Sequence, residues 1–236
     1  MIKKLNSFLH QSFLFITTVV LLGCVSLGNY WSLVTVPQES GLKLTKITDK
    51  EDLLDTEQSF AISKDGTKVV FTSWKSGNGD IYIKSIKGGK GITQRTSRTE
   101  QEVQPSFSPD GSQIVFCSPR GDGWHIYMIQ TEGGSATKQI TTSSPRYAYY
   151  PSFSTDGKKI VFSSDKDTKD SSKEKRNANL WVVNSDGTGL TQLTFHLSDD
   201  IWPVWSPDMT GIYFLSSRGE EQKGVMNIWR LEYDNK

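Results

Sequence analysis

The stretch Pro105-Ser-Phe-Ser-Pro-Asp-Gly-Ser-Gln-Ile-Val-Phe116 recurs along the chain with one fixed internal spacing. Its four copies align on Asp65, Asp110, Asp156 and Asp208, with a period of about 45 to 52 residues. In every copy a valine or isoleucine follows four residues after the aspartate, and a phenylalanine follows two residues later. Self-similarity at this period is typical of propellers and solenoids, whose units bury their faces by stacking on their neighbours.

Each repeat divides into four short segments with strand-like composition. Ser-Pro-Asp-Gly favours a type I turn, so the strands on either side of it form a hairpin. A third strand follows, as in residues 126–129, and a fourth comes after a Gly-Gly or Asp-Gly turn, as in residues 138–141. The second and third strands are apolar on consecutive residues, which indicates that both sheet faces are covered. The sequence therefore predicts an all-β protein, a β-propeller of four four-stranded blades.

The repeat also resembles that of a known family. Its pattern of aromatic-Ser-Pro-Asp-Gly, Ile-Val-Phe-x-Ser, Ile-Tyr-x-x and Gln-Leu-Thr is similar to the TolB-type, WD40-like propeller repeat, which also occurs in the propeller domains of prolyl-oligopeptidase-like enzymes. The similarity covers about residues 42 to 231. It implies a β-propeller that docks partner proteins in the bacterial envelope, without naming the partner.

The N-terminal segment has the features of a lipoprotein export signal. Lys3 and Lys4 precede the apolar run 13–22, which is too short and too interrupted for a transmembrane helix. Leu21-Leu-Gly-Cys24 resembles a bacterial lipobox, whose cysteine is lipidated and becomes the first residue after cleavage. We therefore expect a signal peptide over residues 1–23, lipidation at Cys24, a tether over 24–40 and a TolB-like propeller over 41–236. An uncleaved anchor and plain secretion are the alternatives.

Acyl chains on Cys24 would hold the protein on a membrane. The expected location is the bacterial cell envelope, on the outer membrane, facing the periplasm or the cell surface.

Composition and motifs favour a binding protein over an enzyme. The formal net charge is +1, and loss of Lys3 and Lys4 leaves 25 basic and 26 acidic residues. This balance lacks the basic excess that nucleic-acid binding requires. No Gly-x-Ser-x-Gly nucleophile motif occurs, and His125 and His196 lack companions at ligand spacing. We expect no catalytic residue, no metal and no cofactor.

The two ends of the repeat region are complementary. Leu44-Thr-Lys-Ile-Thr48 matches Leu190-Thr-Gln-Leu-Thr194 and has the sequence of a fourth strand, whereas the last repeat lacks one. We expect the N-terminal strand to complete the last blade, which would remove two exposed edges. The family more often has six or more blades, so the four close either as a monomer or as a strand-exchanged dimer of eight.

Long loops are expected on one face, where the second and third strands connect and where one blade joins the next. On this face an acid precedes a base by eighteen residues in three repeats, which predicts ion pairs at the channel mouth: Glu57–Lys75, Glu102–Arg120 and Asp200–Arg218. A feature present in most blades is expected to serve the fold. The third repeat departs from it, because Ala148 leaves Lys166 without its acid.

Other departures gather in the third repeat and mark it as the candidate contact for an envelope protein. Tyrosine and arginine are enriched at protein interfaces. The expected partner-binding residues are Arg146, Tyr147, Tyr149, Tyr150, Lys166 and Trp202. Two other interpretations stay open: Tyr149 and Tyr150 as core residues, and the protein as a hydrolase, lyase or glycan-binding propeller that uses Glu57, Glu102, Asp199 and Asp200.

Two single residues carry further expectations. Met209 replaces the turn glycine in the fourth repeat and would be strained if that position has a positive φ. Cys117 stands at a strand end without a visible activating neighbour, so we expect a small half-buried side chain.

Overall fold

The structure is a computed structural model of the chain. It describes residues 47, 48, 52, 60–87, 91–134, 136–142, 145, 147–165, 177–219 and 225–233. The chain divides into two compact units, residues 1–45 and 46–236, and all described residues belong to the second. None of the described segments forms a helix of the length and apolarity that crossing a membrane requires.

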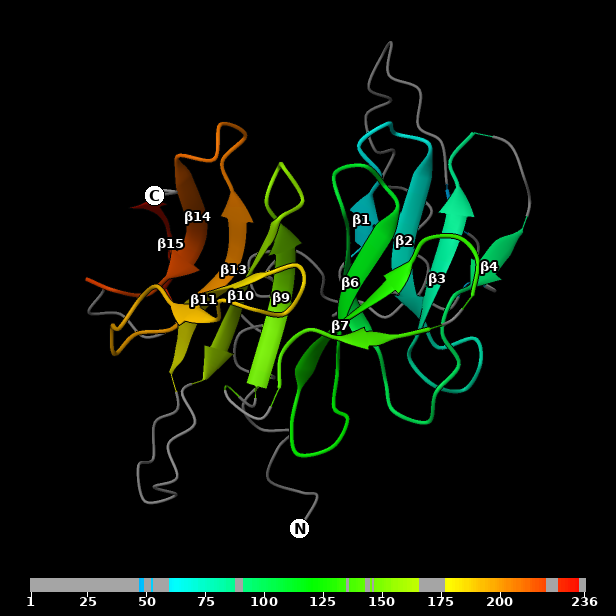
Figure 1. Ribbon diagram of the computed structural model, residues 1–236, viewed down its shortest axis with the longest axis horizontal. Helices are drawn as coiled ribbons and strands as arrows, with labels where there is room; N and C mark the ends of the chain where they lie inside the picture. The colour runs from blue at the N-terminus through cyan, green and yellow to red at the C-terminus, as the bar shows by residue number, and fades with distance from the viewer. Residues whose placement is uncertain are drawn as a thin grey trace, which may run out of the picture. The chain divides into compact units, whose positions relative to one another are not determined.

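The described residues form fifteen strands in four antiparallel sheets that follow one another along the chain (Figure 1). The first sheet contains β1 (Phe60–Ile62), β2 (Lys68–Ser73), β3 (Asp80–Ser85) and β4 (Ile92–Gln94). The second contains β5 (Val103–Phe107), β6 (Gln113–Ser118), β7 (His125–Gln130) and β8 (Lys138–Gln139). The third contains β9 (Tyr147–Phe153), β10 (Lys159–Asp165), β11 (Ala178–Asn184) and β12 (Thr191–Gln192). The fourth contains β13 (Asp200–Trp205), β14 (Gly211–Ser216) and β15 (Asn227–Glu232). We call these sheets the first to fourth blades, because each has the strand order and pairing of a propeller blade.

The repeated Ser-x-Asp turn fixes each hairpin through its side chains. In the second blade the Ser108 hydroxyl donates to Asp110 Oδ1 at 2.6 Å and accepts from the Gln113 N–H at 2.9 Å. Asp110 Oδ1 also accepts the Ser112 N–H at 3.0 Å, and these bonds lower the pKa of Asp110 to about 2. The serine and aspartate make the same bond in the other three turns. The local sequence therefore sets the start of every second strand.

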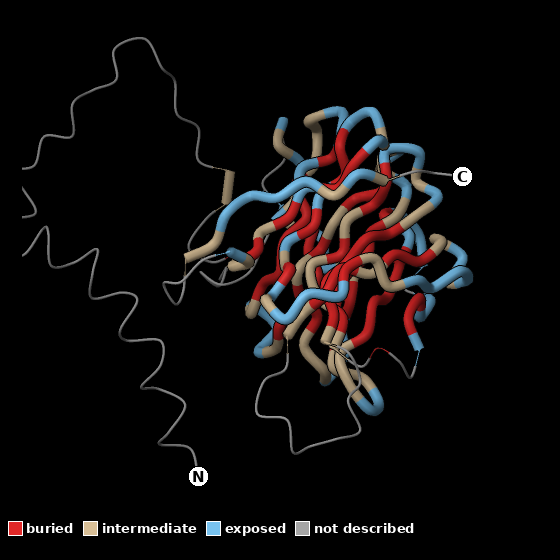
Figure 2. Tube along the Cα trace, turned by 90° about the vertical axis from the view of Figure 1, so that its left-hand side faces the viewer, coloured by how far each residue is buried: buried red, intermediate tan, exposed pale blue. Residues whose placement is uncertain are grey.

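The blades are held together by apolar faces that pack in chain order. One cluster joins Val70 and Ile81 to Phe107 and Phe116 of the second blade. Equivalent clusters join the second blade to the third and the third to the fourth. Figure 2 shows the buried positions running through the middle of the stacked strands, with exposed residues at the turns. In the first three blades the consecutive apolar residues of the second and third strands are buried on both faces, as predicted, apart from the half-buried Trp181. In the fourth blade the prediction is wrong for β15, which is mostly exposed.

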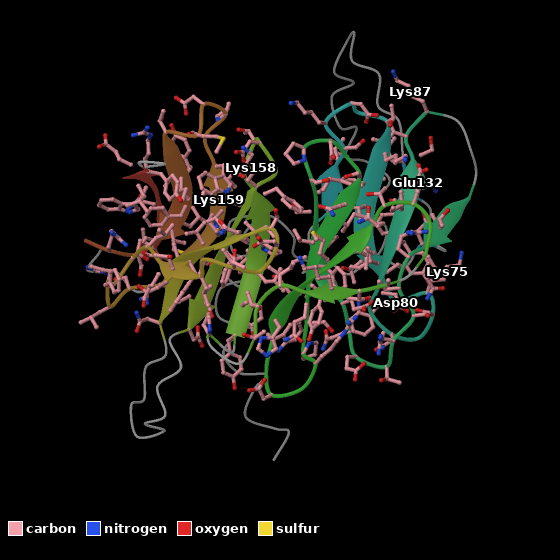
Figure 3. All side chains as sticks on the ribbon, in the orientation of Figure 1. Lys75, Asp80, Lys87, Glu132, Lys158 and Lys159 are labelled. Carbon is pink, nitrogen blue, oxygen red and sulfur yellow. The ribbon has the colours of Figure 1, made fainter. Side chains whose placement is uncertain are left out.

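Strand direction sorts the connections into two sets, as the repeat predicts. Lys75 follows β2 and Lys87 follows β3, and Figure 3 shows them at opposite ends of the first blade. Connections between second and third strands therefore share the Lys75 end with the connections between blades, because all strand pairs within a blade are antiparallel.

The first strands of the last three blades contain a feature that the sequence did not predict. Each has a register shift at a residue with positive φ directly before a proline: Gln104 (56°), Tyr150 (55°) and Trp202 (54°). The residue before proline normally adopts an extended conformation with negative φ, so these bulges need tertiary support. They turn the side chain at the bulge out of the regular alternation.

The predicted completion of the last blade falls mainly outside the described residues, because residues 44–46 are not among them. Of the described part, Ile47 packs against Val69, Phe71 and Tyr82 of the first blade. The fourth blade has three strands among the described residues, and β15 lies at its edge.

Candidate aromatic binding site

Four aromatic rings form a continuous row across the second, third and fourth blades. The Trp124 and Tyr149 ring centroids lie 5.4 Å apart, those of Tyr149 and Tyr150 6.3 Å apart, and those of Tyr150 and Trp202 5.1 Å apart with the rings edge to face. Tyr150 and Trp202 are both bulge residues, so the bulges of neighbouring blades bring their rings together. We call Trp124, Tyr149, Tyr150 and Trp202 the aromatic row.

Gln104, the bulge residue of the second blade, supports this row through its side-chain amide. Its Oε1 accepts the backbone N–H of Tyr150 at 2.8 Å. Its Oε1 also lies 3.5 Å from the Sγ of Cys117, which is fully buried rather than half-buried as expected. Burial raises the pKa of the Cys117 thiol far above its ordinary value, so the thiol is a weak donor and not a nucleophile.

The bulge residues line a groove between the first strands of all four blades. The groove has a volume of about 240 Å³. Its wall includes Phe60 of β1, Gln104 of β5, Tyr150 of β9 and Trp202 of β13, and a proline follows each of the last three. Trp202 is 51% exposed, so its ring is available to a ligand. The wall offers aromatic faces and an amide, with few charges.

Tyr149 of the third blade is half-buried within the row. Burial raises its pKa well above the ordinary value for tyrosine. The phenol therefore stays protonated and neutral at physiological pH. The row is thus an apolar surface with hydroxyl donors, the composition that protein interfaces favour.

Both expected ion pairs that lie wholly within the described residues form at the start of the first strands. Glu102 is fully buried and pairs with Arg120, whose guanidinium stacks 4.3 Å from the Tyr127 ring. Burial raises the pKa of Glu102 to about 7, against the lowering effect of Arg120. Asp200 is also fully buried and accepts from Arg218 Nη2 at 2.5 Å. These acids are held inside the blades by their bases.

Cys24, Glu57, Arg146 and Lys166 lie outside the described residues. Lys75 donates its backbone N–H to the Ser73 hydroxyl at 3.2 Å. Asp199 accepts the backbone N–H of Ala178 at 2.9 Å and so links the start of β11 to the connection that precedes β13.

Tyr147 begins β9 and is half-buried, one residue from the fully buried Ala148. The backbone carbonyl of Trp124 accepts the Ala148 N–H at 2.9 Å, which brings the second-blade loop against the third blade. Of the six expected partner-binding residues, the structure brings Tyr149, Tyr150 and Trp202 into direct contact.

Sequence reasoning missed Trp124 and Gln104. The signal that could have found Gln104 is the proline that follows it, because the same position is Tyr150-Pro and Trp202-Pro in the next repeats. Trp124 gives no such signal, since its contact with Tyr149 joins two blades. Within the part of the chain that is described, no cluster of three or more His, Cys, Asp or Glu side chains is arranged to hold a metal ion.

Comparison with known proteins identifies the repeat. Residues 51–176 match the family model of the TolB beta propeller domain, which is more than half of the chain. No curated protein sequence matches the chain.

Solved structures show the same fold at low sequence identity. A putative TolB from Agrobacterium tumefaciens has a TM-score of 0.60 and 24% identity over 75% of this chain and 59% of its own. TolB from Acinetobacter baumannii has a TM-score of 0.59 and 20% identity over 76% of this chain and 42% of its own. The oligogalacturonate lyase from Vibrio parahaemolyticus has a TM-score of 0.51 and 13% identity over 77% of this chain and 68% of its own. The chain thus spans about half the length of the TolB structures it matches. By its repeat, its four stacked sheets and its match to the family model, the chain belongs to the TolB β-propeller domain family.

Proposed function

We propose that this protein is a non-enzymatic lipoprotein of the bacterial envelope whose propeller binds another protein through the aromatic row and the groove beside it. The observation that carries the proposal is the contact of Tyr149, Tyr150 and Trp202 across two blades, with the Trp202 ring half exposed. Large rigid aromatic side chains supply much of the binding energy at protein interfaces. Three non-glycine residues held at positive φ further mark the first strands as a place where strain serves function.

Binding rather than catalysis is supported by the state of the acids. The alternative function, a hydrolase, lyase or glycan-binding propeller, would need free carboxylates around an open cavity. Glu102 and Asp200 are instead fully buried and paired with Arg120 and Arg218. Propellers of this fold occur both in TolB and in a lyase, so the fold by itself does not choose between the two functions.

The proposed arrangement in the envelope has two parts. Acyl chains on Cys24 anchor the protein to the outer membrane, facing the periplasm or the surface. The stretch 44–48 completes the fourth blade as its fourth strand, because its pattern Leu-Thr-x-apolar-Thr matches that of the stretch 190–194 and the described part of the fourth blade ends at β15.

Quantitative affinity capture with the full-length lipoprotein tests the binding site. We expect Trp202→Ala to reduce recovery of the partner at least about tenfold, as loss of an aromatic anchor does. Alanine at position 202 must also adopt a positive φ, so a thermal melt of the variant checks that it still folds. The matched control is Phe195→Ala, since Phe195 is 75% exposed in the connection between the third and fourth blades. Equal recovery by both variants would contradict the proposed site, and recovery of no specific protein would contradict the proposed function.

A further inference from the structure

The first three blades attach their fourth strand by the same pair of hydrogen bonds. The second or third residue of the third strand donates its N–H to a threonine hydroxyl at 2.9 Å, as Leu180 does to Thr194. Its carbonyl accepts the N–H of the residue before that threonine, as from Leu193 at 2.8 Å. Ile81 with Thr96 and Ile126 with Thr141 repeat the arrangement. A strand ending in threonine is therefore the standard cover for the outer edge.

In the fourth blade, the strand with which such a fourth strand would pair is β15, which lies at the edge of the sheet and is exposed. Ile228 stands opposite Leu215 as Leu180 stands opposite Ser163, so Ile228 holds the position of Leu180. Leu180 is fully buried, whereas Ile228 is 75% exposed. Tyr213 likewise holds the position of the buried Val161 and is 43% exposed. The outward face of the fourth blade thus exposes Tyr213 and Ile228 at positions where the third blade has buried apolar residues.

The chain carries one more copy of the covering strand, in the stretch 44–48. Thr48 aligns with Thr194, and Ile47 aligns with Leu193. Leu193 packs in the cluster of Ile212 and Phe214. Ile47 packs against Val69 and Phe71, the residues that hold the same repeat positions in the first blade. Ile47 therefore packs on the first blade as Leu193 packs on the fourth blade. Leu193 follows the fourth strand of the preceding blade, so Ile47 has the position expected of a residue from a blade that precedes the first.

In one chain, the two surfaces lie at opposite ends of the stack. Clusters join the first blade to the second, the second to the third and the third to the fourth, and in the described ranges no cluster joins the fourth to the first. Figure 1 shows β15 and β4 at the two ends of the series of sheets. Ile228 stays exposed while Ile47 is already packed on the first blade of its own chain.

We propose that a second copy of this chain supplies the fourth strand to β15, in a head-to-tail contact. Thr48 of one copy accepts the N–H of Ile228 of the other, and its Ile47 lies between that copy's fourth blade and its own first blade. This inference rests on the proposed completion of the fourth blade by the stretch 44–48 and names the copy that provides it.

The residues on the outward face of the fourth blade suit a contact between chains. Arg230 stands opposite Tyr213, where the first three blades have Ile83, Met128 and Val182. Exchange of a buried aliphatic residue for arginine beside a tyrosine is a difference expected between an interface and an interior. In a head-to-tail contact, β15 of one copy pairs with the stretch 44–48 of the other. When two copies form both such contacts with each other, neither copy has an unpaired β15 or an unpaired stretch 44–48. The predicted assembly is a dimer of eight blades.

Disulfide trapping between differently tagged full-length copies tests the proposal. One copy carries Thr48→Cys and the other Asn227→Cys, because their counterparts in the third blade, Thr194 Oγ1 and Asn179 Oδ1, are 3.4 Å apart. Cross-strand neighbours at this spacing are within reach of a disulfide. The expected result is a dimer band that contains both tags on a non-reducing gel. Each variant alone and the unsubstituted chain are the blanks for Cys24 and Cys117.

A matched control and a single-chain variant distinguish completion of the fourth blade from association of two copies. Thr48→Cys combined with Glu232→Cys, at the other end of β15, is expected to give no mixed dimer. Both cysteines of the first pair are also placed in a single chain. An internal disulfide there without any dimer would overturn the role of a second copy and leave the strand completion intact. Absence of both the internal and the mixed disulfide would overturn the completion as well, while partner capture at Trp202 would remain a separate result.

Discussion

At position 209 a methionine occupies a turn site that is glycine in the other three repeats. Its φ is 61°, close to the 71° of Gly111 and the 73° of Gly157. The sequence predicted strain on the condition that φ is positive, and the structure meets that condition. A side chain in the left-handed region costs about 1 to 2 kcal/mol relative to glycine.

We therefore expect Met209→Gly to stabilise the protein by about 1 kcal/mol and to raise its melting temperature. Thermal and urea unfolding of the two proteins measure the difference. The reverse exchange, Gly111→Met, is the matched control, because Gly111 has a positive φ and no neighbouring atom lies within 4 Å of the place that a Cβ would take. It should lose a similar amount. An unchanged or lower melting temperature for Met209→Gly would show that the turn does not store this strain.

The elements that follow local sequence were predictable, and those that depend on contacts between blades were not. The Ser-x-Asp turn makes its own hydrogen bonds, so the second strands begin where the repeat places them. The fourth strands are shorter than expected: β8 has two residues, although Ile140 continues the bonding to Ile126 at 2.8 Å. The bulge at Tyr150 is held by Gln104, which is 46 residues away. No local pattern could show that support.

The same distinction applies to the candidate site. Tyr149, Tyr150 and Trp202 could be selected because they depart from the repeat or stand beside its prolines. Their grouping needed the third and fourth blades to pack together, and Trp124 joins them from the second blade. The acid-to-base spacing anticipated the pairs Glu102–Arg120 and Asp200–Arg218, because the start of a first strand and the end of its second strand are neighbours in a hairpin.

The buried pair of the second blade predicts a pH-dependent loss of stability. Arg120→Met leaves Glu102 buried without its base, and at pH 8 we expect a loss of about 3 kcal/mol in the free energy of unfolding. Burial raises the pKa of Glu102 from 4.5 to about 7. The folded protein is therefore stabilised at low pH, where Glu102 is protonated, and loses this stabilisation as the pH rises through this range. Without Arg120 the pKa rises further. The deficit of the variant should therefore be larger at pH 8 than at pH 5.

Urea unfolding of both proteins at the two pH values measures this dependence. Lys68→Met is the control, since Lys68 pairs with the exposed Glu132 at 2.6 Å on the protein surface and should contribute less than about 1 kcal/mol at either pH. An equal deficit at pH 5 and pH 8 would show that the ionised Glu102 carboxylate is not what Arg120 stabilises.

For the whole molecule, attachment to the membrane is expected to depend on one residue near the N-terminus. Cys24→Ser should abolish incorporation of labelled fatty acid, because a serine at the lipobox position has no sulfur to which the lipid can be attached. Metabolic labelling followed by gel electrophoresis measures it. Cys117→Ser is the matched control and should keep the label, since that thiol is fully buried. Continued labelling of Cys24→Ser would contradict the lipoprotein assignment.

The prolines beside the bulges limit how a partner can enter the groove. Pro105, Pro151 and Pro203 lie on first strands, which are the inner edges of their sheets. Proline has no backbone N–H to donate, and the positive φ of the preceding residue interrupts the regular spacing of backbone carbonyl groups along the strand. An extended peptide therefore cannot lengthen these sheets from the inside by backbone pairing. On these three blades, a ligand in the groove must be recognised through side chains, and the three edges are also protected from templating fibrous self-association.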